Sequence, residues 1–302
     1  MASSIIGVYV ESWAVPWTSL ATTNELARID KPINTVFLSF VEPNTTYGKG
    51  QCTFANTGLN FSVSFDIVKT AIIMLKQKGI RVMLAVGGAS YQWDRYNPNA
   101  CAALMNDLGC DGIDLDWEPT NGYADRAQLS AIINNFRVAL SLKYLSLAVF
   151  GYGCMDPNGD TYRGLNIDGL KEQGKSLDWV NIMAYDGGKE LNVIQCYESV
   201  KKYFAKPVAV GFQVGKQGWG DALLTMADVE KICRYITVKN DGCFVWAYFK
   251  QGPPSAKEVC QKAGEIFSAS VIPKPPAPTP LYPPRSLNQF QCPQCKCNLT
   301  VT

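Results

Sequence analysis

Residues 111–118 read DGIDLDWE. Acidic and apolar residues alternate along it. The acidic set is Asp114, Asp116 and Glu118. The apolar set is Ile113, Leu115 and Trp117. Side chains two residues apart on a strand point to the same face, so a strand here places the carboxylates on one face and the apolar side chains on the other. In a barrel the first face points inward and the second packs on helices.

Short apolar runs rich in β-branched residues recur on both sides of this stretch. Together with it they predict eight strands, at residues 5–10, 34–40, 80–86, 111–117, 144–150, 178–185, 207–212 and 242–249. Near-continuous apolar runs of this kind are typical of strands buried on both faces, as in parallel sheets.

Amphipathic segments with helical periodicity lie between the strands, for instance at 63–78, 125–141, 189–204, 225–237 and 254–268. Eightfold alternation of strand and helix predicts the α/β class and a (β/α)8 TIM barrel. A doubly wound open sheet is the alternative, but the first strand lacks the Gly-rich fingerprint of that fold. One helix fills the connection between the last two strands, so we expect a single domain without an inserted α+β domain.

Composition shifts sharply near residue 270. We expect the barrel to occupy residues 1–270, followed by a Pro-rich linker at 271–284 and a short tail at 285–302. The tail carries Cys292, Cys295 and Cys297. Their C-x-x-C-x-C spacing suggests a metal clip, but structural zinc requires four nitrogen or sulfur ligands and the chain has no histidine. Disulfide cross-linking to another chain and an attachment tail remain open.

Charge and hydropathy narrow the class of partner. The 302 residues carry a net charge of +2, and no basic run is present, so neither nucleic acid nor membrane is expected as a partner. A neutral substrate fits better. The protein is expected to be a monomer. No apolar stretch is long enough to span a bilayer, and the N-terminus shows no signal peptide. A secreted mature form and an intracellular or virion-associated protein remain open. The 11 cysteines are expected to be mostly reduced.

The absence of histidine restricts the chemistry. It removes the Ser-His-Asp and Cys-His mechanisms and every imidazole base, so acid–base work falls to carboxyl groups, Tyr, Lys or Cys. Carboxylates that share a dry interior raise one another's pKa values, so Glu118 at the outer end is expected to stay protonated near neutral pH. A solvated acidic face and a divalent-metal triad are less favoured alternatives. No metal or cofactor is expected.

Four acidic residues resemble the D-x-x-D-x-D-x-E signature of glycoside hydrolase family 18: Asp111, Asp114, Asp116 and Glu118. Further segments resemble other motifs of that family, in order along residues 5–268. They are YVESW (9–13), LAVGG (84–88), MAYD (183–186) and FVWAYF (244–249). Ala85 stands where the third-strand motif can carry a hydroxyl, so Asp114 is expected to depend on Tyr9 for support.

The resemblance implies chitin or N-acetylglucosamine oligosaccharides as substrates and a substrate-assisted retaining mechanism. Glu118 is implied as the proton donor, Asp116 as the group that orients the substrate acetamide, and Tyr185 as its hydrogen-bond donor. Met183 and Asp186 are implied to shape the pocket, and Trp246 to form its floor.

Four aromatic residues fall in the predicted loops that follow strands: Trp13, Tyr91, Trp93 and Trp219. Each is a candidate sugar platform, although packing is the commoner role. The favoured hypothesis is that the protein is an endo-acting chitinase. An endo-β-N-acetylglucosaminidase acting on N-glycans and a chitin-binding lectin are the alternatives, and the presence of Glu118 argues against the lectin.

Overall fold

The computed structural model describes residues 4–118, 126–155, 165–218, 223–237 and 241–269, together with two short strands near the C-terminus. The chain forms two compact units, Met1–Ser270 and Val271–Thr302. In the second unit, β9 (Phe290–Gln291) pairs with β10 (Asn298–Leu299) in antiparallel fashion. The predicted Pro-rich linker and the three tail cysteines lie outside the described residues.

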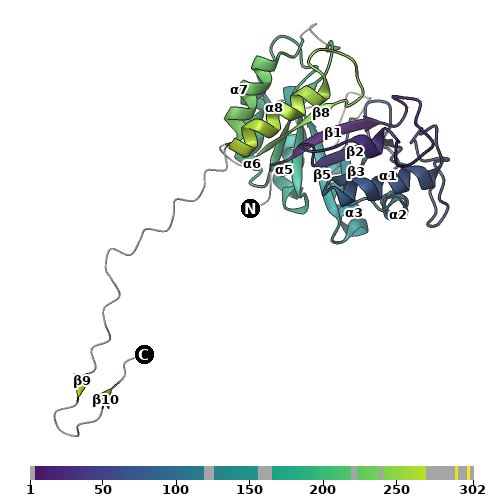
Figure 1. The fold of residues 1–302 in the computed structure, drawn as a ribbon, viewed down its shortest axis with the longest axis horizontal. Helices are drawn as coiled ribbons and strands as arrows, with labels where there is room; N and C mark the ends of the chain where they lie inside the picture. Colours follow the sequence, from purple (N-terminus) through teal and green to yellow (C-terminus); the bar gives the residue numbers. More distant parts are fainter. Residues whose placement is uncertain are drawn as a thin grey trace. The chain divides into compact units, whose positions relative to one another are not determined.

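The first unit is a closed barrel of eight parallel strands that follow one another in sequence order. The strands are β1 (Ile6–Glu11), β2 (Thr35–Val41), β3 (Arg81–Gly87), β4 (Gly112–Asp116), β5 (Tyr144–Phe150), β6 (Trp179–Met183), β7 (Val208–Gln213) and β8 (Gly242–Trp246). Pairing of β1 with β8 closes the ring, and the helices surround it (Figure 1). The predicted (β/α)8 architecture is confirmed.

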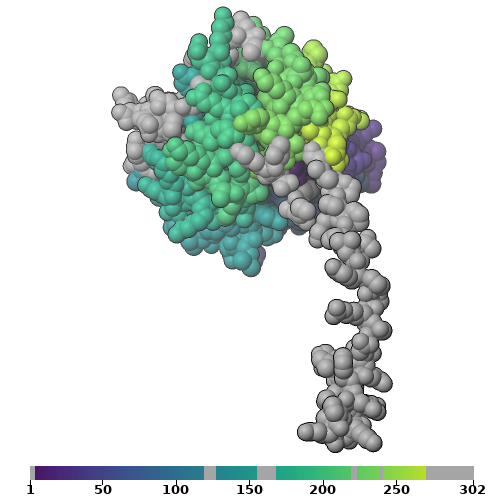
Figure 2. Space-filling model, turned by 90° about the vertical axis from the view of Figure 1, so that its left-hand side faces the viewer, coloured from purple at the N-terminus to yellow at the C-terminus, as the bar shows by residue number. Residues whose placement is uncertain are grey.

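Helices connect the strands and cover the outside of the barrel, and the face shown in Figure 2 is formed largely by the second half of the chain. They are α1 (Phe65–Gln77), α2 (Pro98–Leu108), α3 (Arg126–Leu140), α4 (Gly151–Met155), α5 (Leu165–Gln173), α6 (Val193–Tyr203), α7 (Met226–Thr237) and α8 (Ala256–Ala269), with short 3-10 turns at Leu26–Arg28 and Gly174–Ser176. All five predicted helices are present. No helix among the described residues is long and apolar enough to cross a membrane.

Helix α2 is not among the five segments named from the sequence, although its ends carry clear signals. Asn97 caps its first turn by accepting a hydrogen bond from the backbone N–H of Ala100 at 3.1 Å, and Pro98 occupies the first helical position. Gly109 ends the helix in the left-handed conformation with φ of 79°. Its apolar side chains pack into the core between strands and helices.

Two apolar cores lie on either side of the strands. The larger one fills the space between strands and helices and includes Ile113, Leu115 and Trp117, as the alternation predicted. The smaller one lies inside the barrel and includes Phe37, Met83 and Phe244. The eight cysteines of the described residues are free thiols, and seven of them are buried.

The same type of side-chain hydrogen bond joins the strands in pairs at the N-terminal end of the barrel. The residue just before each even-numbered strand accepts a hydrogen bond from a backbone N–H at the start of the preceding odd-numbered strand. The four pairs are Asn34 with Ile6, Asp111 with Val82, Asp178 with Leu145 and Asp241 with Val208, at 2.8–2.9 Å. Each contact ties two neighbouring strands together near their N-terminal ends.

Asp241 is the most deeply buried of the three carboxylates in this set. It also accepts hydrogen bonds from the Tyr197 hydroxyl at 2.6 Å and pairs with the Lys201 ammonium at 3.1 Å. Its side chain is 1% exposed, whereas that of Asp178, which pairs with Arg137, is 37% exposed. Removing one partner of a buried ion pair leaves an uncompensated charge. Loss of Asp241 should therefore cost more unfolding free energy than loss of Asp178.

We therefore expect Asp241→Ala to lower the free energy of unfolding by about 3–5 kcal/mol. Asp178→Ala is the matched control, because it breaks the same strand contact at a solvated site and should cost only about 1–2 kcal/mol. Urea denaturation followed by circular dichroism measures both. Equal losses would show that burial of the charge is not what distinguishes Asp241.

Candidate active site

The acidic face of β4 points into the barrel, and Glu118 follows just beyond the strand. The predicted strand, residues 111–117, extends one residue beyond the end of β4. The last pair in the ladder with β3 joins Gly87 to Asp116, after which Gly87 and Gly88 turn β3 away with φ of 107° and 89°. Glu118 thus stands two residues past the end of β4, at the mouth of the barrel.

Asp114 is fully buried and receives three hydrogen bonds from three other strands. The Tyr9 hydroxyl donates to Oδ2 at 2.6 Å, the Ser146 hydroxyl donates to Oδ1 at 2.6 Å, and the Asn181 amide donates to Oδ1 at 3.0 Å. The expectation that Asp114 depends on Tyr9 is therefore too narrow. Burial raises the pKa of Asp114 to about 6, although the three donors act to lower it.

Asp116 lies one step further out and is held more weakly. Its side chain is 4% exposed, and its Oδ1 atom has no hydrogen-bond partner in the structure as described. Burial raises its pKa well above the usual range, and the negative charges of Glu118 and Asp114 raise it further. Coupled carboxyl groups of this kind hold a shared proton more tightly than isolated ones do.

Tyr185 supplies a phenol beside these carboxyl groups. Burial and the charges of Asp116 and Glu118 raise its pKa well above the ordinary value of a tyrosine. The group thus stays protonated and can donate a hydrogen bond into the cleft. Tyr9 is neutral for the same reasons, with Asp114 as the nearest carboxylate.

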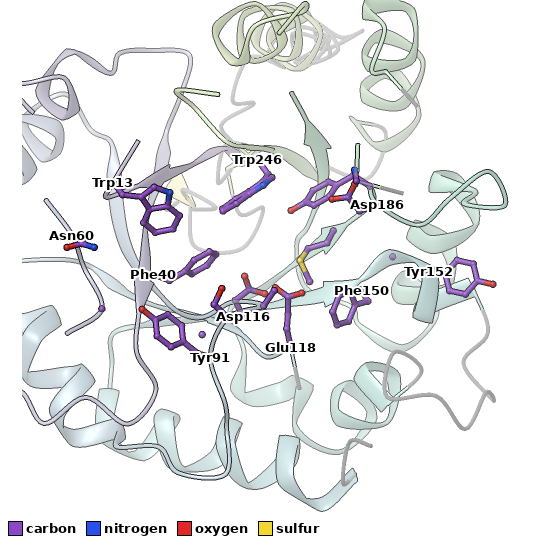
Figure 3. Close-up of a pocket in the computed structure, with 18 residues that line it drawn as sticks. Trp13, Phe40, Asn60, Tyr91, Asp116, Glu118, Phe150, Tyr152, Asp186 and Trp246 are labelled. Carbon is purple, nitrogen blue, oxygen red and sulfur yellow. The ribbon is translucent and has the colours of Figure 1, made fainter. Parts of the chain in front are cut away.

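These groups open into a cleft of about 690 Å³ at the C-terminal end of the strands. The lining residues that carry polar or aromatic side chains are Trp13, Phe40, Asn60, Ser90, Tyr91, Asp116, Glu118, Phe150, Tyr152, Tyr185, Asp186 and Trp246, with Met183 among the remainder. In Figure 3 the carboxyl groups of Asp116 and Glu118 lie side by side at its centre.

An aromatic wall faces the two carboxyl groups. The rings of Phe40 and Trp246 stack with centroids 5.5 Å apart, and Tyr9 meets Trp246 edge-on at 5.8 Å. Both wall residues adjoin non-proline cis peptides, at Ser39–Phe40 and Trp246–Ala247. Trp13 lies toward one end of the cleft and Tyr152 toward the other, as Figure 3 shows, with side chains 50% and 41% exposed.

Asp186 lies in the turn after β6 and is tied to the loop that follows β7. It has φ of 51°, and its carboxylate accepts hydrogen bonds from the Gly218 N–H at 2.5 Å and the Gln213 amide at 3.4 Å. The Asp186 N–H donates to the Gln217 side-chain oxygen at 3.1 Å. These contacts hold the turn that carries Tyr185.

The structure brings most of the predicted site residues to one place. Seven line the cleft: Trp13, Asp116, Glu118, Met183, Tyr185, Asp186 and Trp246. Tyr9 and Asp114 lie beneath it. Trp93 is 2% exposed and packs in the outer core, so it offers no platform, whereas Tyr91 lines the cleft. Trp219 lies outside the described residues.

Other residues of the site were not identified from the sequence. Phe40, Phe150 and Tyr152 line the cleft, and Ser146 and Asn181 support Asp114. The signal for Ser146 was present, because a polar residue interrupts the apolar run at 144–150. Nothing in the local sequence says which way the Phe40 ring points.

The arrangement combines a carboxyl group at the mouth of the barrel, an unpartnered carboxyl oxygen beside it, a neutral phenol and an aromatic wall. Such a cleft can bind a neutral ring by stacking and transfer a proton to it. Among the described residues, no group of three or more Cys, Asp or Glu side chains is placed to hold a metal ion.

The sequence is similar to known proteins. The family model described as glycosyl hydrolases family 18 matches residues 5–211. Chitinase 1 of Aphanocladium album is 29% identical over 141 residues, which cover 41% of this chain and 32% of that protein. The chain thus spans about a third of the length of that relative.

Two solved structures share the fold over most of the chain. A GH18 chitinase from Pseudoalteromonas aurantia matches with a TM-score of 0.62 and 18% identity, covering 86% of this chain and 100% of that one. A fungal endo-β-N-acetylglucosaminidase of family 18 matches with a TM-score of 0.63 and 18% identity, covering 87% and 96%. At these identities the likeness concerns the fold.

Gly87 of β3 lies so close to the backbone of Asp116 that a larger residue should not fit there. A Cβ on Gly87 would lie 2.1 Å from the backbone oxygen of Asp116, whereas a Cβ on Gly109, which has a similar positive φ, would meet nothing within 4 Å. We expect Gly109→Ala to cost about 1–2 kcal/mol of unfolding free energy from backbone strain. Gly87→Ala should cost about 1–3 kcal/mol more from overpacking. Denaturant titration compares them, and equal costs would contradict the steric argument.

Proposed function

The chain belongs to family 18 of the glycosyl hydrolases, and from this premise we propose that it is a glycosidase, specifically an endo-acting chitinase that hydrolyses β-1,4-N-acetylglucosamine linkages. The observation that carries the proposal is the unpartnered Oδ1 atom of Asp116, beside Glu118 and opposite the Trp246 ring. A buried acceptor left without a donor is costly, so it suits a ligand that brings an N–H group.

Glu118 is the proposed proton donor. It stands at the mouth of the barrel, lines the cleft and interacts electrostatically with Asp116 and Tyr185. In the first step its carboxyl proton passes to the glycosidic oxygen, and the bond from that oxygen to the anomeric carbon breaks. The chain provides no histidine for this role.

The nucleophile in this proposal is the acetamido carbonyl oxygen of the substrate, which bonds to the anomeric carbon and gives an oxazolinium ion. Asp116 accepts a hydrogen bond from the acetamido N–H, and Tyr185 donates one to the acetamido oxygen. The Glu118 carboxylate then takes a proton from water, whose oxygen attacks the anomeric carbon and reopens the ring. Two displacements on the same carbon retain its configuration.

The rest of the cleft supports binding of an extended, neutral sugar chain. Trp246 and Phe40 offer a flat aromatic surface, while Trp13 and Tyr152 stand toward opposite ends of the cleft. Between β7 and β8 the described residues form one helix, α7, and a single bridge between Lys216 and Leu223. A cleft with exposed aromatics at both ends favours cutting within a chain over removal of end units.

An endo-β-N-acetylglucosaminidase is the second candidate, because it needs the same acetamide chemistry and a solved enzyme of that kind shares the fold. The chitobiose core of an N-glycan would occupy the same two positions on either side of Glu118. We propose that residues 1–270 form the catalytic barrel and that residues 271–302 form a linker and tail that attach it to another partner.

Replacing the proposed acid should separate binding from turnover. We expect Glu118→Gln to lower kcat on chitin oligosaccharides by about 10²- to 10⁴-fold while binding is retained. Glu11→Gln is the control, because Glu11 is a half-buried carboxyl group whose pKa is raised by burial but which lies outside the cleft lining. Product analysis and calorimetric titration measure the two effects. Retention of more than a tenth of the activity would falsify the assignment.

The mechanism also makes the N-acetyl group obligatory. We expect a fluorogenic chitotrioside to be cleaved on the order of 10³-fold faster than its deacetylated analogue, because the internal nucleophile is lost. A high-mannose glycoprotein, assayed in parallel, separates the two candidate functions. Cleavage of the glycoprotein in preference to the chitotrioside would favour the second candidate, and equal rates on both trisaccharides would contradict assistance by the acetamide.

A further inference from the structure

Asp114 lies in one layer of the barrel between two small side chains. The strand ladders pair Ala85 of β3 with Asp114 on one side and Ser146 of β5 with Asp114 on the other. Ala85 and Ser146 are both fully buried. The Ser146 hydroxyl donates to Asp114 at 2.6 Å, whereas Ala85 presents only a methyl group to the barrel interior.

The other two donors to Asp114 come from strands that are not its neighbours. Tyr9 reaches from β1 and Asn181 from β6. The Asn181 amide is oriented by the Trp179 indole N–H, which donates to its oxygen at 3.2 Å, so its nitrogen must face Asp114. Ser146 is thus the donor supplied by an adjacent strand, and the strand ladder fixes its position.

We propose that Ser146 is a positioning residue that keeps Asp114 ionised, so that the proton used in the reaction stays on the outer carboxyl groups of Asp116 and Glu118. Ser146 thereby supplies from β5 the hydroxyl that Ala85 does not supply from β3. The kinetic consequence rests on the proposed function, but the effect on Asp114 does not.

The Asp114 carboxylate is stabilised by hydrogen bonds from neutral donors. Its titratable neighbours are Tyr9 from β1, Asp116 and Glu118 from β4 and its extension, and Tyr185 after β6. Apolar side chains also face the interior, among them Phe37, Met83, Ala148, Ala209 and Phe244. The Arg81 guanidinium, on the same face of β3 as Met83, lies over the rings of Tyr144 and Trp179. Among the described residues no cation contributes to the pKa of Asp114, and each of the three hydrogen bonds acts to lower it.

Without the Ser146 hydroxyl, the carboxylate form of Asp114 loses a charge-assisted hydrogen bond, so the pKa of Asp114 rises. Asp114 then takes up a proton at higher pH, and its negative charge no longer raises the pKa of Asp116. The outer pair loses its proton to the interior, so activity falls at the acidic side of the profile.

The test compares four variants by the pH dependence of kcat on chitin oligosaccharides. We expect the acidic limb for Ser146→Ala to move up by about 1–2 pH units. Ser146→Thr, which keeps the hydroxyl, should restore the original limb. So should Ser146→Ala combined with Ala85→Ser, because the new hydroxyl faces Asp114 from β3. Thr35→Val is the control, since it removes a buried hydroxyl that bonds Asn34 and not Asp114.

An unchanged acidic limb in Ser146→Ala overturns the role of Ser146. A shifted limb that the Ala85→Ser exchange does not correct overturns the equivalence of the two positions. If Ser146→Ala does not fold, Ser146→Cys replaces the hydroxyl by a weak donor and should shift the limb in the same direction.

A second measurement separates this inference from the proposed function. Carboxyl ¹³C NMR of aspartate-labelled protein follows Asp114 directly and requires no substrate. We expect its pKa to rise in Ser146→Ala and to return in the double variant. If the wild type cleaves no chitin oligosaccharide, the proposed function fails, while the titration still decides the role of Ser146. A pKa of Asp114 that is equal in wild type and Ser146→Ala overturns the inference even if the enzyme is active.

Discussion

The carboxylate of Asp114, held inside an apolar barrel without a counter-ion among the described residues, is the constraint on which the site depends. Transfer of a charge from water into such an interior is costly unless hydrogen bonds replace its hydration. Three donors from β1, β5 and β6 do so, and they lie 105, 32 and 67 residues from Asp114 in sequence. The closed barrel, in its observed register, brings all three to one point.

The position of this charge orders the groups above it. Burial raises the pKa values of Asp116 and Tyr185, and the neighbouring negative charges, that of Asp114 among them, raise these pKa values further, so Tyr185 remains a phenol. The cleft therefore presents carboxyl groups, a neutral phenol and aromatic rings to its ligand, and the aromatic rings suit an uncharged sugar. The same ordering explains why acid–base chemistry is possible in a chain without histidine.

Local pattern was sufficient to predict the barrel, since alternation in DGIDLDWE and the recurring apolar runs report which face of each strand is buried. Helix α2 could also have been found, because Asn97, Pro98 and Gly109 mark its ends. Glu118 lies beyond the strand because β3 turns away at two glycines, and Phe40 lies in the cleft where the register of β2 against β3 shifts between Leu38 and Val41. These outcomes depend on neighbouring strands, which a single stretch of sequence does not report.

Ser146 shows why motifs examined one strand at a time underestimate the support of a buried charge. Every strand of a closed barrel has two neighbours, so a residue in the interior layer can receive its donor from either side. In the sequence, Ala85 of β3 offers no hydroxyl to Asp114, so a hydrogen-bond donor is missing on that side. The strand register places Ser146 of β5 in the same layer, on the other side of Asp114. The carboxylate of Asp114 requires a hydrogen-bond donor in its own layer of the barrel, and either adjacent strand, β3 or β5, can provide that donor.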